Sequence, residues 1–136
     1  MKLIYFLIAG LSILAILIDC NRKEEFKYFE TPVDSLQAPD TINVNETLPI
    51  ILFGTFTNQI GDYPQIDHIE HSIDQNIIQL KAIAKIPSDA ESLMLQPYLR
   101  PWMDTLVLRN LASDIYIIKA RGWNDTPIVD TVVILY

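Results

Sequence analysis

Hydrophobic and polar residues alternate along much of the chain after residue 40, and this period of two is typical of β-strands that bury one face. In the clearest case, residues 77–86, one face of the strand would carry Ile78, Leu80, Ala82, Ala84 and Ile86. The same reasoning predicts further strands over Thr41–Glu46, Leu48–Thr57, Ile66–Ile73, Thr105–Arg109, Ile115–Arg121 and Ile128–Leu135. Seven short strands separated by turns predict an all-β domain, an antiparallel β-sandwich.

One stretch departs from the strand pattern. Residues 88–95 begin with Ser88 and carry Glu91 three positions later, which is the sequence signature of a helix start. Pro97 and Pro101 follow and would end such a helix. We therefore expect a single helical turn that crosses between the two sheets.

The N-terminus has a different pattern, with an uncharged apolar run from Leu3 to Ile18 behind Lys2. This arrangement is typical of an export signal, and we assign residues 1–19 to a signal peptide. As a helix, the run would rise about 24 Å, which is shorter than the hydrocarbon core of a bilayer at about 30 Å. A transmembrane helix extended by a snorkelling Lys2 is the alternative.

The lone cysteine directly follows this run, and Leu17-Ile18-Asp19-Cys20 resembles the lipobox of bacterial lipoproteins. Asp19 departs from that pattern, which usually has a small residue at this position. The resemblance implies that Cys20 is lipidated, becomes the first residue of the mature chain and anchors the protein to a membrane. Several acyl chains, at about 0.8 kcal/mol per buried methylene, are enough for stable attachment. An incidental cysteine beside a membrane anchor is the alternative.

Lys23, Glu24 and Glu25 come next and resemble the export tag of Bacteroidetes-type lipoproteins, a lysine followed by two acidic residues. The resemblance implies an outer-membrane lipoprotein that is surface-exposed or periplasmic, and a solvated charged linker is the alternative. The polar residues around Pro32 and Pro39 show no lasting periodicity. We expect residues 20–40 to form a flexible tether and residues 41–136 to form the folded domain.

A second resemblance lies in Leu111-Ala112-Ser113-Asp114-Ile115-Tyr116-Ile117-Ile118. This stretch is similar to the Leu-x-x-Gly-x-Tyr-x-Ile/Val signature of immunoglobulin-like domains, with Asp114 at the glycine position. The resemblance implies an immunoglobulin-like or fibronectin-III-like sandwich. It also implies that Tyr116 forms a tyrosine corner, with its ring in the core and its hydroxyl bonded to nearby backbone.

Charge and composition narrow the range of functions. The chain has 10 Lys and Arg against 17 Asp and Glu, a net charge of −7, and no basic cluster, which argues against nucleic acid as a partner. A single cysteine excludes an intrachain disulfide and a cysteine-based metal site. The four glycines form no phosphate-binding loop, and no Gly-x-Ser-x-Gly motif is present. We therefore expect a protein that is not an enzyme and binds no cofactor.

The two histidines, His68 and His71, are the remaining candidates for metal chemistry. On a strand, residues three positions apart point to opposite faces, so the two imidazoles would not share a metal. We expect exposed or cross-strand paired side chains. A metal-dependent hydrolase centred on the two histidines is a remote alternative.

Aromatic side chains in predicted loops are the better candidates for ligand contact, because flat rings stack on sugars and peptides. These residues are Tyr63, Tyr98, Trp102 and Trp123, and Trp102 could instead pack in the core. Our first hypothesis is a lipid-anchored, non-enzymatic binding or accessory subunit of a larger membrane complex. Its contact region would include Tyr63 and Trp123, at the end of the domain opposite the tether. The alternative is a small carbohydrate-binding module that presents Tyr98, Trp102 and Trp123 to a glycan.

Overall fold

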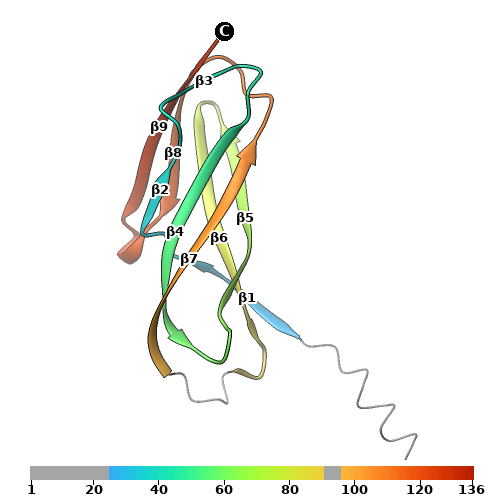
Figure 1. Ribbon diagram of the computed structural model, residues 1–136, viewed down its shortest axis with the longest axis vertical. Coiled ribbons are helices and arrows are strands. Elements are labelled where there is room, and N and C mark those ends of the chain that lie inside the picture. The colour runs from blue at the N-terminus through green and yellow to red at the C-terminus, as the bar shows by residue number, and fades with distance from the viewer. Residues whose placement is uncertain (1–24, 91–95) are drawn as a thin grey trace, which may run out of the picture.

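The structure, a computed structural model, describes residues 25–90 and 96–136. Most of this part of the chain is β-strand, and the strands form two sheets, one of six strands and one of three (Figure 1). The strands are β1 (Phe26–Thr31), β2 (Ser35–Gln37), β3 (Thr41–Asn43), β4 (Leu48–Gln59), β5 (Gln65–Asp74), β6 (Ile77–Pro87), β7 (Gln96–Leu108), β8 (Ile115–Arg121) and β9 (Pro127–Leu135). A short 3₁₀ turn, η2 (Trp123–Asp125), joins β8 to β9.

The smaller sheet has the order β2-β4-β7, and its strand pairs are antiparallel. Its two long strands, β4 and β7, pair from Leu48 opposite Leu108 to Gln59 opposite Gln96. The register shifts once, where Tyr98 and Leu99 of β7 together face the single residue Thr57. This β-bulge bends β7 near its start.

The larger sheet is organised around β6. One edge of β6 pairs with β5 over nearly its whole length. The other edge is divided between two strands: β8 runs parallel to residues 77–80, and β1 runs antiparallel to residues 82–87. The two strands meet end to end, where the Val33 N–H donates to the Arg121 carbonyl at 2.9 Å. β9 and β3 extend the sheet beyond β8, and β3 is parallel to β9.

The hydrophobic core lies between the two sheets. Alternate residues of β4 and β6 point inward and are fully buried, as the alternation predicts. They form one cluster with the inward residues of β8 and β9, so each sheet covers the inner face of the other. The largest fully buried members are Leu48, Ile50, Leu52, Ile78, Leu80, Ile118, Val132 and Ile134.

The structure corrects three predictions about strands. Residues 26–37, which we expected within a flexible tether, form β1 and β2 and are paired with β6 and β4. β7 begins at Gln96 instead of residue 105, because an edge strand accommodates Pro97 and Pro101. The sandwich is not purely antiparallel, since the β6–β8 and β3–β9 pairs are parallel.

Two further predictions concern local features. The ring of Tyr116 is buried in the core, but its hydroxyl forms no hydrogen bond with the described residues, so the expected tyrosine corner is absent there. The helical turn expected over residues 88–95 lies mostly outside the described residues.

Candidate functional site

The strand residues on the outer face of the smaller sheet carry no ionisable side chain, and at its edge the Asp34 carboxylate accepts a hydrogen bond from the Thr55 hydroxyl. Cross-strand neighbours share a face, and the register places Phe53 opposite Met103 and Ile51 opposite Thr105 on the side away from the core. We call this surface the uncharged face; it consists of Ser35, Gln37, Pro49, Ile51, Phe53, Thr55, Pro101, Met103, Thr105 and Val107. Met103, at its centre, is 65% exposed although its side chain is apolar.

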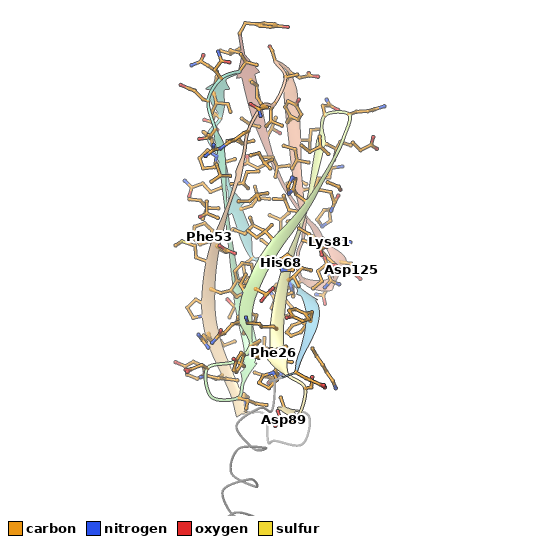
Figure 2. All side chains as sticks on the ribbon, turned by 90° about the vertical axis from the view of Figure 1, so that its right-hand side faces the viewer. Phe26, Phe53, His68, Lys81, Asp89 and Asp125 are labelled. Atoms are coloured by element: carbon orange, nitrogen blue, oxygen red, sulfur yellow. The ribbon has the colours of Figure 1, made fainter. Side chains whose placement is uncertain are left out.

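The outer face of the larger sheet is different, because it carries charged side chains such as Glu70, Lys81 and Lys119. Figure 2 places Phe53 on one side of the molecule and Lys81 on the other. The solvated face of an antiparallel sheet is ordinarily polar. An exposed apolar surface that spans several strands is typical of an interaction site.

The open edge of the smaller sheet is protected against pairing with another strand. β7 is an edge strand, and Pro97 and Pro101 supply no backbone N–H groups to an added strand. The Thr105 N–H is occupied by the Asp104 carboxylate at 2.8 Å. These positions of β7 therefore offer no free N–H group to an added strand.

A second feature is a hydrogen-bond network around Asp34, in the connection between β1 and β2. Its carboxylate accepts a bond from the indole N–H of Trp123 at 2.6 Å and another from the Thr55 hydroxyl at 2.6 Å. Its own N–H donates to the Phe53 carbonyl at 2.7 Å. Asp34 thus ties η2 to β4, and both carboxylate oxygens are used in structural bonds.

Trp123 borders a groove of about 310 Å³. On one wall, Glu30 forms an ion pair with Arg121, with 3.1 Å between Oε1 and Nε. Glu30, Thr55 and Trp123 are thus bonded to other protein groups, and the remaining lining combines apolar side chains with Thr31, Thr57 and Asn58. The lining residues are Phe29, Glu30, Thr31, Pro32, Thr55, Phe56, Thr57, Asn58, Pro64, Ile86 and Trp123.

A third feature is an exposed charged cluster around Asp67 on β5. One carboxylate oxygen lies 2.8 Å from His68 Nδ1, and the other lies 3.0 Å from Lys85 Nζ. The hydrogen bonds from His68 and Lys85 lower the pKa of Asp67. The same contacts raise the pKa of His68, with a smaller contribution from Glu70, and raise the pKa of Lys85.

The two histidines do not converge. The register pairs His68 with Ile83 and His71 with Leu80, so the imidazoles lie on opposite faces of β5, as strand geometry predicts. Within residues 25–90 and 96–136, no three side chains of His, Cys, Asp and Glu gather as a metal site would require.

The four aromatic residues predicted to contact a ligand lie in separate places. Trp102 is in the core and only 9% exposed, so the alternative that it packs there is confirmed, and it is not available for ligand contact. Tyr98 lies in β7 and is 58% exposed. Tyr63 packs against Phe26, with 5.7 Å between ring centroids, so it lies beside the start of β1 and not at the far end as expected. Trp123 is 43% exposed in η2 and bonded to Asp34. These rings form no common platform of the kind that the glycan-binding alternative would use.

Residues of the uncharged face were missed from the sequence. In β4, Ile51 and Phe53 fill the positions between inward residues, so the strand is apolar on both faces. The predicted strand over Leu48–Thr57 was given no outer face, although a continuous apolar run fits a sheet with an apolar outer surface. That excess of apolar residues was the available signal.

The lipoprotein features fall largely outside the described residues. This is true of the signal peptide over residues 1–19, of Cys20, and of Lys23 and Glu24. Glu25 is described, and its carbonyl accepts a hydrogen bond from the Ser88 N–H at 2.8 Å. The described part of the chain contains no helix with the length and apolarity needed to cross a bilayer.

Comparison with known proteins gives no relative. A scan against protein-family models, a search of curated proteins and a search of solved structures each found no match.

Proposed function

We propose that the protein is a lipid-anchored, non-enzymatic lipoprotein of the bacterial cell envelope that acts as a binding or accessory subunit of a membrane complex. It binds its partner through the uncharged face. The anchor is Cys20, and the Lys23-Glu24-Glu25 tag directs the protein to the outer membrane. The framework is an immunoglobulin-like β-sandwich in which the parallel β6–β8 pair departs from the usual antiparallel order.

The uncharged face is the observation that carries the proposal. The chain has a net charge of −7 and places charged side chains on the outer surface of its larger sheet, yet Met103, Phe53 and their neighbours are uncharged and reach the surface. Burying a charge without a partner is costly, so such a face best fits another surface that is also apolar and uncharged. The expected partner is an envelope protein with a face of this kind.

With a membrane anchor, a modest affinity for the partner protein is sufficient to form the complex. A protein confined to a membrane encounters its membrane partners at high effective concentration, so a small apolar contact can hold a complex together. The polar groups around Asp34 and Glu30 are engaged in structural bonds, which supports binding instead of catalysis.

A charge placed in the uncharged face tests this function. In intact cells that produce the full chain, covalent cross-linking of the wild type should give a complex of fixed mass. Met103→Lys should lose it, because the lysine would be buried without a counter-charge. Val129→Lys is the matched control, since Val129 is also an exposed apolar strand residue but lies on β9 of the larger sheet.

Equal retention of the complex by both variants would exclude the uncharged face as the contact surface. A cross-linked product with the mass of two copies of this chain would identify a homodimer and contradict the role of accessory subunit.

A further inference from the structure

The distance between the proposed anchor and the folded domain is short. This inference rests on the proposed function, in which Cys20 is lipidated. Cys20 precedes Phe26, the first residue of β1, by only six positions. An extended chain covers at most about 3.6 Å per residue, so β1 begins within about 22 Å of the acylated cysteine. The flexible tether expected over residues 20–40 is shortened, because the folded domain already begins with β1.

One end of the domain is therefore held near the bilayer. The register places the start of β1 beside the end of β6, where Phe26 pairs with Pro87. It also places the end of β4 beside the start of β7, where Gln59 pairs with Gln96. Figure 1 shows these strand ends together, far from the C-terminus, and Figure 2 places Phe26 and Asp89 at the same end.

This end exposes large apolar and aromatic side chains. Leu99 is 70% exposed, and it stands beside Tyr98 in the bulge of β7. A bulge re-aims side chains away from the regular pleat, and it takes both residues out of regular pairing with β4. The Arg100 guanidinium bonds to the Asp62 carbonyl, so the bulge is held next to the turn that carries Tyr63.

The chemistry of this end matches the headgroup region of a bilayer. Tyrosine has an apolar ring and a polar hydroxyl, and such side chains are enriched at membrane–water interfaces. The basic residues near this end, Lys27, Lys85 and Arg100, all have partners within the protein, Lys85 with the Asp67 carboxylate and Arg100 with the Asp62 carbonyl, so the contact does not need anionic lipid.

We infer that this end of the domain rests on the headgroup region of the lipid bilayer, with Tyr98 and Leu99 as the contacting side chains. The lipid and the bulge together give two points of attachment. The strands of the smaller sheet run from this end toward the other, so the uncharged face stands upright on the membrane. A neighbouring membrane protein would meet it from the side (Figure 1).

Spin labels test the orientation on the lipidated full chain bound to vesicles of neutral phosphatidylcholine. One label is attached at Leu99→Cys, and the matched control is attached at Ala112→Cys, an exposed position near the start of β8 at the opposite end. Collisions with a water-soluble nickel complex are measured before and after vesicle binding. We expect the label at position 99 to lose most of these collisions and the label at 112 to keep them.

The outcomes separate this inference from the proposed anchor. Protein that floats with the vesicles while the label at 99 stays as accessible as the label at 112 overturns the orientation and leaves the anchor intact. Protein that does not float overturns the anchor, and the orientation with it. A loss of collisions at 99 that requires anionic lipid contradicts the headgroup contact described above.

Discussion

Trp102 lies directly opposite Gly54 in the β4–β7 pair, and its indole covers the glycine so closely that a Cβ there would overlap the ring. The same indole packs on Phe56, with 6.1 Å between ring centroids. The absence of a side chain at Gly54 is therefore what lets the larger aromatic lie flat within the core.

Gly54→Ala should destabilise the domain, because the added methyl group forces the indole of Trp102 out of its position. Overpacking of this kind costs about 1–3 kcal/mol of unfolding free energy. Urea denaturation measures the change. Thr57→Ala, an exposed substitution on the same strand, should stay within about 0.5 kcal/mol of the wild type. Equal stability of Gly54→Ala and the wild type would contradict the packing described here.

Asp34→Ala should also destabilise the domain, because Trp123 and Thr55 lose the acceptor of their hydrogen bonds. We expect a loss of about 1–3 kcal/mol in urea denaturation. The fluorescence of Trp123 should shift as its ring is released. Asp40→Ala is the control, since the described residues give its exposed carboxylate no hydrogen-bond partner. Similar unfolding midpoints for the two variants would show that the network carries no stability.

The titration of His68 should report its contact with Asp67. The hydrogen bond favours the imidazolium, so the pKa of His68 should lie above the value of about 6.5 for an exposed histidine. Its contribution to stability is therefore present at low pH and is lost as the pH rises through that raised pKa. For Asp67, whose pKa is lowered, the contribution is lost as the pH falls through the lowered value.

NMR titration of the imidazole checks this. In Asp67→Asn, the His68 midpoint should move down toward the ordinary value, because the carboxylate charge is gone. Asp114→Asn, at the start of β8, should leave it unchanged. A midpoint that is the same in wild type and Asp67→Asn would refute the contact.

If Cys20 is lipidated as proposed, Cys20→Ala should release the protein from the membrane, because the acyl chains would have no attachment site. Detergent phase partition measures the change: the wild type should enter the detergent phase, and the variant should enter the aqueous phase. Ser35→Ala, which keeps the cysteine, serves as the control. Unchanged membrane retention of Cys20→Ala would rule out lipidation as the anchor.

Several strands could be predicted because their local pattern matches their environment. In β6, the inward residues from Ile78 to Ala84 alternate with Gln79, Lys81 and Ile83, and the mostly polar outer positions reflect a strand with one buried face. β1 could not be found this way. Its central residues, Tyr28 and Phe29, are both exposed, and the strand exists because it pairs with the free edge of β6.

Local sequence pattern also could not predict the start of β7, the parallel β6–β8 pair or the exposed residues of the site. Two prolines in β7 resembled a loop, although an edge strand tolerates them. Parallel pairing of β8 with β6 joins segments that are distant in sequence, and no short motif encodes it. For the candidate site, the expectation that loop aromatics contact ligands selected Trp102, which is buried. It did not select the neighbouring residue Met103, which is exposed.

The edge of β6 that pairs with both β1 and β8 joins the first and the late strands of the domain. β1 and β8 occupy that edge together, and the Arg121 guanidinium reaches back across 91 positions to the Glu30 carbonyl. A chain still emerging from the ribosome has already synthesised β1 but not yet β8. Such long-range closure is slow, so the sheet stays incomplete until the last strands arrive. For the export proposed above, this delay would be useful, because translocation of an unfolded chain requires that folding has not yet been completed.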